Sequence, residues 1–451
     1  MTVTRETLLA ASPYLRELAA REASWLETIG EPDAALEEIL AAVAAGGRAA
    51  DDEAEIGRIL RIAKGRAALV AATAEVEGDW TTAQATAALS DLADAALDAG
   101  LEVLLRRAAE KGTLAPNTNA AGCGLALFAL GKHGGRELNY SSDIDIVAFF
   151  DPECGAMTDP LEATKFYARL VQKLAALMQD RTDYGYVFRT DLRLRPDPGS
   201  TPVAIPLDAA LAYYESRGQN WERAAWIKAR PCAGDRGVGA AFLKELAPYI
   251  WRKHLDFAAI ADIQAMKRQI NMSKNVGDVR VEGHNVKLGL GGIREIEFFT
   301  QTQQLIAGGR DRSLRVRPTV EALAALAAAD WISTEAAEDL CRTYWFLRAV
   351  ENRLQMLRDE QTHTMPEAAD EIAVIARLMD APDRETFETR YRAALSLVVN
   401  YYSELFTEGE TLAGGEGNLV FTGSDDDPGT LETLSGMGFQ EPSKAIAIVR
   451  K

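Results

Sequence analysis

The spacing of apolar residues divides the chain into a helical beginning, a mixed middle and a helical remainder. Through residues 1–115, apolar positions such as Leu36, Ile39 and Val43 recur at the three- and four-residue spacing of amphipathic helices, in a background rich in Ala, Leu, Glu and Arg. The same periodicity returns after residue 235. It predicts helical segments near 236–280, 292–307, 317–358 and 367–410.

Short apolar runs bounded by Gly, Pro and Asp occupy residues 116–235, and this pattern is typical of strands. Between the second and third runs, an apolar stripe around Leu170 and Leu174 predicts a helix, with Asp159 as its cap and Pro160 in its first turn. The fold class predicted is α+β, predominantly α-helical, with a small mixed β-sheet domain flanked by helical domains. The strand-like runs are "GLALFAL" (124–130), "DIDIVAFF" (143–150), "YVFRTDLRLRP" (186–196) and "PVAI" (202–205).

These changes of pattern predict how the chain is organised. The last region is rich in glycine and acidic residues, as a linker would be, and it stops on a helical pattern still in progress. We therefore expect the chain to be one part of a longer protein. The four regions are an N-terminal helical region (1–115), the mixed domain (116–235), a C-terminal helical bundle (236–410) and a linker (411–451).

Charge and composition narrow the classes of partner. The formal net charge of the 451 residues is −18, whereas proteins that bind nucleic acid usually carry a basic excess, so we expect no nucleic-acid partner. The sequence shows neither the apolar segment of a signal peptide nor the roughly 18 apolar residues of a membrane span. The four widely separated cysteines favour a reduced, cytoplasmic protein with no disulfide framework and no zinc site.

Two aspartates, Asp143 and Asp145, stand at the start of the second apolar run. Residues two apart on a strand share a face, with Cα atoms about 6.5 Å apart. Two carboxylates so close repel each other unless a cation lies between them. Mg²⁺ suits this position because it binds through one or two carboxylates together with substrate phosphates. The alternative is that the pair forms a solvated strand end.

A third carboxylate, Asp191, is predicted by strand alternation to share a polar face with Arg193 and Arg195. Three carboxylates can hold two metal ions about 3.5–4 Å apart, an arrangement that serves in-line phosphoryl displacement. The arginines would supply paired donors for phosphate oxygens. The alternative is that both arginines simply form ion pairs with the aspartates.

The turn "GKHGGRELNYSS" (131–142) leads into these aspartates. Gly134 and Gly135 would let the backbone approach a ligand, and a short helix after them would direct its N–H groups at an anion. The turn is not a P-loop, because the G-x-x-x-x-G-K-[ST] pattern is absent. Lys132 is either a phosphate-binding residue or a solvated turn lysine, and His133 is interpreted as a local hydrogen-bonding residue.

Five segments in fixed order resemble the family of bifunctional glutamine synthetase adenylyltransferase/adenylyl-removing enzymes, whose domains belong to the DNA polymerase β-like nucleotidyltransferases. The resemblance covers nearly the whole chain and implies a nucleotidyltransferase catalytic domain at 116–235. The "REIEF" form at 294–298 and the beginning near "SPYLRELAAREASWL" resemble the N-terminal, adenylyl-removing half. The segments are "GKHGGRELNYSSDIDIVAFF", "RTDLRLRPDPGSTPVAI", "YYESRGQNWERAAWIKARPCAGD", "VKLGLGGIREIEFFTQ" and "LRAVENRLQMLRDEQTHTMP".

This resemblance implies a regulatory enzyme of nitrogen metabolism that removes AMP from the adenylylated tyrosine of glutamine synthetase. The reaction implied is phosphorolysis, which yields tyrosine and ADP with the help of two Mg²⁺ ions. Adenylylated glutamine synthetase is the partner implied, phosphate and ADP are the ligands, and the PII signal protein and glutamine are the regulators. The open alternatives are ATP-dependent adenylylation of glutamine synthetase by the same type of site and an inactive regulatory binding module.

Carried over by position, the resemblance implies that Asp143, Asp145 and Asp191 are the catalytic, metal-binding carboxylates. The implied phosphate-binding turn contains Gly134, Gly135 and Ser142. The basic residues expected at phosphate or nucleotide are Arg193, Arg195, Lys228 and Arg294, and further candidates are Lys132, Glu295 and Glu297.

Two helical motifs stay open between function and packing. The helix after Gly291 and Gly292 would either face an anion or pack with Ile293, Ile296 and Phe299 inward. Trp226, in "NWERAAWIKARP", is interpreted as a core residue, as is Trp221. The "ENRLQ" segment (351–355) is interpreted as helix packing.

Overall fold

The computed structural model describes residues 3–252 and 280–412, together with positions 431, 435, 443 and 444. The chain divides into the compact units Met1–Val399 and Asn400–Lys451, and the sheet belongs to the first. The part of the predicted 236–280 helix beyond residue 252 lies outside the described residues, as does nearly all of the predicted linker at 411–451.

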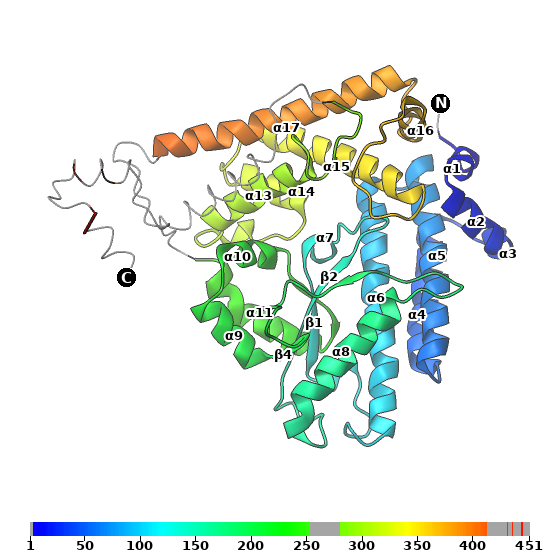
Figure 1. Ribbon diagram of the computed structural model, residues 1–451, viewed down its shortest axis with the longest axis vertical. Coiled ribbons are helices and arrows are strands. Elements are labelled where there is room, and N and C mark those ends of the chain that lie inside the picture. The colour runs from blue at the N-terminus through cyan, green and yellow to red at the C-terminus, as the bar shows by residue number, and fades with distance from the viewer. Residues whose placement is uncertain (1–2, 253–279, 413–430, 432–434, 436–442, 445–451) are drawn as a thin grey trace. The chain divides into compact units, whose positions relative to one another are not determined.

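The helices predicted for the N-terminal region are confirmed. Long helices α4 (Pro32–Ala49), α5 (Glu53–Glu77) and α6 (Thr82–Glu110) pack side by side (Figure 1). Their ends follow from side-chain caps: Asp52 accepts two N–H bonds at the start of α5, and Thr81 forms a capping box at the start of α6. Three short helices precede them: α1 (Arg5–Ala11), α2 (Pro13–Arg21) and α3 (Ala23–Leu26).

A small mixed sheet follows, as predicted. Its order is β3-β2-β1-β5, and β4 also pairs with β2. Strand β1 is antiparallel to β2 and β5, whereas β3 and β4 are parallel to β2. The strands are β1 (Leu125–Ala129), β2 (Ile144–Phe150), β3 (Thr190–Asp191), β4 (Ala204–Pro206) and β5 (Arg230–Gly234).

One prediction about the strands was wrong, and one strand was not predicted. The third run forms only the two-residue strand β3 and then turns, so the alternation expected across 186–196 is not realised. Strand β5 was missed because its sequence, "RPCAG", contains proline and glycine and carries little apolar pattern. Glycine at position 234 adopts φ +76°, and its N–H bonds to Asp98, so the strand ends there.

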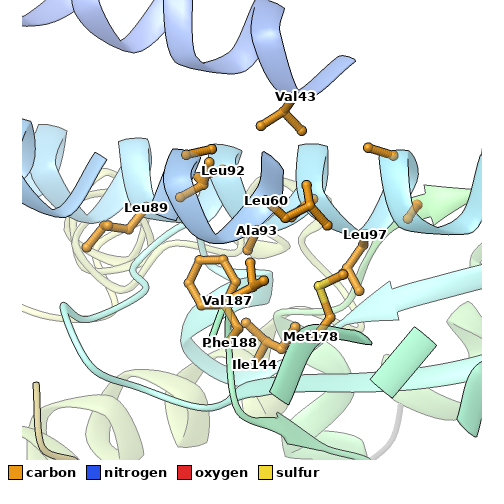
Figure 2. Close-up of a cluster of buried hydrophobic side chains, with 14 of the residues drawn as sticks. Val43, Leu60, Leu89, Leu92, Ala93, Leu97, Ile144, Met178, Val187 and Phe188 are labelled. Atoms are coloured by element: carbon orange, nitrogen blue, oxygen red, sulfur yellow. The ribbon is translucent and has the colours of Figure 1, made fainter. Parts of the chain in front are cut away.

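The two faces of β2 pack against different helices. Ile144, Ile146 and Ala148 join the core formed by the N-terminal helices and α8 (Ala163–Gln179), the predicted helix between the second and third runs. Figure 2 shows this core where Leu92 and Leu97 of α6 meet Ile144 and Met178. Val147 and Phe149 face the opposite core, with α9 (Leu207–Ser216), α10 (Asn220–Ile227) and α11 (Arg236–Ile250).

Trp226 of α10 lies in that second core, stacked on Phe149 with ring centroids 6.0 Å apart. Its interpretation as a core residue is therefore confirmed, whereas Trp221 is 46% exposed and the same interpretation was wrong for it.

Short 3₁₀ turns lie before β1, α8 and α14. They are η1 (Ala120–Gly122), η2 (Pro160–Glu162), which Asp159 caps, and η3 (Arg312–Leu314).

Of the helices described after α11, the first three pack against one another. The predicted segments 317–358 and 367–410 are each two helices, because Asp330 and Asp380 adopt positive φ angles of 57° and 52° that interrupt the helical path. Figure 1 shows α15 above the short helix α7. The helices are α13 (Ile293–Ala307), α14 (Thr319–Ala328), α15 (Thr334–Met356), α16 (Ala369–Leu378) and α17 (Arg384–Leu412).

The closest approach of α4 and α6 predicts a sensitive position. A Cβ added to Gly47 would lie 2.8 Å from the Ala99 Cα, too close for the two helices to stay where they are. We expect Gly47→Ala to lower the free energy of unfolding by about 1–3 kcal/mol, because overpacking outweighs the better helix propensity of alanine. Urea denaturation measures this change.

Gly65→Ala in α5 is the matched control. There the added Cβ would meet only the mobile end of Leu18, at 3.2 Å. We expect a clearly smaller loss of stability, so equal losses for the two variants would show that helix spacing is not the constraint.

Candidate active site

Pairing of β2 with β3 gathers the three predicted carboxylates at one end of the sheet. Asp143 comes directly before β2, and Asp145 is its second residue. The parallel register aligns Asp145 with Asp191 on β3, so these two residues are cross-strand neighbours. All three side chains are half-buried.

Arginines bind the two outer aspartates. Arg189 Nε donates to Asp143 Oδ1 at 2.9 Å. Arg193 donates hydrogen bonds to the Asp191 carboxylate from its backbone N–H, its Nε and its Nη2, and Nη2 lies 2.5 Å from Oδ2. This hydrogen bonding lowers the pKa of Asp191. The Arg193 side chain is nonetheless 82% exposed, so solvent or a ligand can reach it.

Asp145 has no such arginine among the residues that the structure describes. Burial, together with the neighbouring charges of Asp191 and Asp143, raises the pKa of Asp145 to about 6. The positive charges of Lys287 and Lys132 lower the pKa of Asp145, but they do not outweigh burial and the two carboxylates. The central carboxylate therefore carries negative charge that its surroundings do not balance. This is the state of a carboxylate that a cation would stabilise.

The backbone of the turn comes close to Asp145 at one glycine. Gly131 opens the short helix α7 (Gly131–Gly134) with φ +52°, and a Cβ there would lie 2.5 Å from Asp145 Oδ2. Both the conformation and the space therefore require glycine. The N–H groups of Gly134 and Gly135, expected at phosphate, donate to the Leu130 and Gly131 carbonyls at 2.8 and 3.1 Å.

Lys132 and His133 of α7 both point into buried surroundings. Lys132 Nζ donates to Glu351 Oε1 at 2.7 Å, which excludes the solvated-turn alternative. His133 Nε2 lies 2.7 Å from Asp94 Oδ1, so His133 does form a hydrogen bond, but with a residue 39 positions away rather than with a local partner.

Helix α15 holds the rest of this turn through polar side chains. Asn352 Oδ1 accepts from Asn139 Nδ2 at 2.9 Å, and Gln355 Oε1 accepts from the Ser141 N–H at 2.8 Å. Both residues are fully buried. The interpretation of 351–355 as helix packing was therefore incomplete, because the polar members of the motif bind the segment that carries Asp143.

Lys228 lies within a second buried cluster. Its ammonium donates to Glu137 at 2.7 Å, to Thr319 at 2.9 Å and to Glu297 at 3.3 Å. Burial alone would lower the pKa of Lys228, but the two glutamates outweigh burial and raise it. The cluster joins the end of α10, the turn, α13 and α14.

The "REIEF" helix, α13, packs with its apolar residues inward, which was the second of the two alternatives for this motif. Ile293, Ile296 and Phe299 are all buried, and Glu295 Oε2 accepts from the Gly291 N–H at 3.0 Å. Arg294 lies exposed on the first turn of α13.

Arg195 and Ser142 take different positions around the aspartates. Because the chain turns after β3, the Arg195 guanidinium donates to the carbonyls of Leu192 and Thr201, at 2.8 and 3.1 Å. Ser142 is half-buried between Ser141 and Asp143.

Two charged residues near the aspartates were not predicted. Arg189 binds Asp143, and the alternation that selected Asp191 and Arg193 would also have selected it, two positions earlier. Lys287 lowers the pKa of Asp145, and its backbone is fixed by Asn285 Oδ1, 3.1 Å from its N–H. The one signal in the sequence that could have indicated Lys287 is its position, four residues before the Gly291–Gly292 pair.

The donor atoms fit a hard cation at the aspartates. Three carboxylates offer oxygen alone, which Mg²⁺ prefers. A second candidate metal site is formed by Asp94, His133 and Cys232, whose ligand atoms all lie within 4.8 Å of one another. It is the one such cluster within residues 3–252 and 280–402. Its ligands are an oxygen, a nitrogen and a sulfur, and Arg230 already binds both oxygens of Asp94. The ligand atoms of the three aspartates do not all lie within 4.8 Å of one another, and arginines bind two of these residues.

No helix in the described part of the chain is both long enough and apolar enough to cross a membrane.

Comparison with known proteins identifies similar sequences along the chain. Residues 4–245 match the profile of the glutamate-ammonia ligase adenylyltransferase family, and residues 263–406 match that of GlnD PII-uridylyltransferase. Bifunctional glutamine synthetase adenylyltransferase/adenylyl-removing enzymes are 52% identical in Agrobacterium fabrum, 51% in Mesorhizobium japonicum and 49% in Rhizobium meliloti. These matches cover 97–98% of this chain but only 45–46% of each relative. The chain thus spans a little under half their length.

The raised pKa of Asp145 predicts that its charge opposes folding. A carboxyl group whose pKa is raised in the folded state contributes stability below its unfolded pKa, and this stability is lost as the pH rises through about 6. With a metal chelator present, we expect Asp145→Asn to raise the free energy of unfolding at about pH 7.5 by on the order of 1–3 kcal/mol. The gain shrinks at about pH 5. Urea denaturation at the two pH values measures both quantities.

Asp143→Asn serves as the control, because it removes a carboxylate that Arg189 already binds. We expect no gain in stability from this change at either pH. If both variants lose stability to the same degree, Asp145 is not an uncompensated charge.

Proposed function

The chain belongs to the glutamate-ammonia ligase adenylyltransferase family, and on that basis we propose that it removes AMP from the adenylylated tyrosine of glutamine synthetase by phosphorolysis. The relatives are named for both an attaching and an adenylyl-removing activity, and the chain spans a little under half their length. Assignment of the removing activity to this chain is part of the proposal, supported by the "REIEF" form of α13.

One observation carries the proposal of phosphoryl chemistry. The β2–β3 register pairs Asp145 with Asp191, and Asp143 lies two residues before Asp145. Among the residues that the structure describes, no arginine is bonded to Asp145, and its pKa is raised. Aspartates 143, 145 and 191 would hold Mg²⁺, and three carboxylates can support a pair of ions. The metal would offset negative charge on the reacting phosphates.

The chain's own residues would place the two substrates. Arg193 is the exposed arginine at this end of the sheet, and its fork of donors suits a phosphate ion. Lys287 adds a positive charge close enough to act on Asp145. We propose that these two groups orient the attacking phosphate. Lys132 and Lys228 instead keep the turn in place through their buried glutamate partners.

The proposed reaction is one displacement at phosphorus. An oxygen of orthophosphate forms a bond to the α-phosphorus of adenylyl-tyrosine, and the bond from that phosphorus to the tyrosine oxygen breaks. ADP and tyrosinate result, and tyrosinate takes its proton from solvent. Because tyrosine has a pKa of about 10, its anion leaves without a dedicated general acid. The proposal extends to regulation by the PII signal protein and glutamine.

Labelled phosphate tests the direction of the chemistry. We expect adenylylated glutamine synthetase, Mg²⁺ and ³²P-phosphate to yield ADP that carries the label in its β-phosphate. Unlabelled AMP, formed at a rate indifferent to phosphate, would instead mean hydrolysis. Thin-layer chromatography separates the two nucleotides.

Substitution of each aspartate tests the site. We expect Asp143→Asn, Asp145→Asn and Asp191→Asn each to slow ADP formation by about 100-fold or more, because an amide keeps the shape but loses the charge. Asp183→Asn, at an exposed aspartate before β3, is the control and should leave the rate unchanged. Near-normal turnover in any of the three would remove that residue from the site.

The attaching activity is the rival, and the relatives' bifunctional name is what favours it. Unmodified glutamine synthetase and ATP labelled at the α-phosphate distinguish the two. We expect no transfer of label to the synthetase. Robust labelling that disappears in Asp145→Asn would assign the attaching activity to this chain.

A further inference from the structure

The segment that delivers Asp143 to the site has no regular structure of its own. Residues 139–143 lie between α7 and β2 and belong to neither a helix nor a strand. Their position is therefore set by contacts with other parts of the chain rather than by a hydrogen-bond ladder. Those contacts come from α15, from the segment before β3 and from α5, where Ala68 and Lys64 bond to Tyr140.

Gln355 of α15 supplies the contact of that helix with Ser141, two residues before the aspartate. It is fully buried, and its Oε1 accepts the Ser141 N–H at 2.8 Å. Its Nε2 faces the Thr362 carbonyl at 3.4 Å. A neutral amide suits this place because it accepts from one backbone group and donates to another. Without it, the buried Ser141 N–H would lose its partner.

Arg189 holds the same serine from the opposite side. Its Nη2 donates to the Ser141 carbonyl at 2.8 Å and to the hydroxyl at 3.0 Å, while its Nε donates to Asp143. Ser141 is thus fixed at its N–H by α15 and at its carbonyl by the arginine that also fixes Asp143. Gln355, Ser141, Arg189 and Asp143 form one connected unit.

We infer that Gln355 is a positioning residue, which sets the Asp143 carboxylate in its metal-binding place by holding the Ser141 backbone. This inference rests on the proposed function, because it takes Asp143 as a metal ligand. Groups that orient metal ligands from behind typically affect metal affinity by 10- to 100-fold. Gln355 would act on metal affinity in this way without touching metal or substrate.

Direct binding of Mn²⁺ tests the inference without any turnover. Electron paramagnetic resonance of free Mn²⁺ measures binding to the full chain as the ion is titrated. We expect Gln355→Met, which keeps the shape but removes the acceptor, to weaken Mn²⁺ binding by about 10-fold. Gln355→Glu retains the acceptor for the Ser141 N–H but loses the donor to the Thr362 carbonyl, so we expect its Mn²⁺ affinity to lie between those of Gln355→Met and the wild type.

Arg353→Met is the matched control on the same helix. Arg353 is buried and contacts the Leu378 carbonyl and Glu75 instead of Ser141. We expect it to lower the melting temperature while Mn²⁺ affinity stays within about twofold of the wild type. If Gln355→Met does not fold, Gln355→Ala replaces it, because the space left can admit a water that pairs with the Ser141 N–H.

The outcomes separate this inference from the proposed function. Loss of Mn²⁺ binding in Asp145→Asn, with a tenfold weakening in Gln355→Met but not in Arg353→Met, supports it. Loss in Asp145→Asn with unchanged binding in Gln355→Met, or in Gln355→Ala where it replaces Gln355→Met, overturns the inference alone. If the wild type binds no Mn²⁺ that depends on Asp145, the metal site fails and the inference fails with it.

Discussion

The buried contact between Lys132 and Glu351 is the constraint on which the site depends. Lys132 Nζ lies 2.7 Å from Glu351 Oε1. The same carboxylate lies 2.7 Å from His363 Nδ1 and 3.3 Å from Arg348 Nε. Burial alone would raise the pKa of Glu351, but the surrounding positive charges lower it, so the carboxylate stays ionised. A buried charge left without its partner is costly, which fixes the turn against α15 in one register.

The site shows the opposite arrangement of charge. Around Glu351, Glu137 and Lys228, each buried ion has a partner at hydrogen-bonding distance. At the end of β2, by contrast, arginines in the described part of the chain bind two of the three carboxylates, and Asp145 keeps a raised pKa. The balanced clusters hold the backbone rigid, and the unbalanced charge remains where a cation can bind. A site of this kind needs both, because an uncompensated carboxylate in a loose turn would move toward solvent.

What the sequence could predict follows from the range of the interactions involved. Strand β2 and helix α8 were predicted because the local spacing of their apolar residues indicates which side chains are buried. The length of β3 was not predicted. The chain turns after this strand and Arg195 donates to carbonyls of the turn, and the alternation of side chains does not indicate such contacts. Lys228 was expected at phosphate, yet its partner Glu137 stands 91 positions away, beyond any local pattern. The role of Gln355 was hidden for the same reason, since Ser141 is 214 positions away.

The most direct test of the central claim is an anomalous difference map from crystals of the protein soaked in Mn²⁺. We expect a peak at the end of β2, within coordination distance of Asp145 and bridging toward Asp143 or Asp191. Arg193 should be displaced from Asp191 in that structure. A map with no peak at Asp145, or with a peak only at Asp94, His133 and Cys232, would contradict the assignment of the aspartates as the metal-binding site.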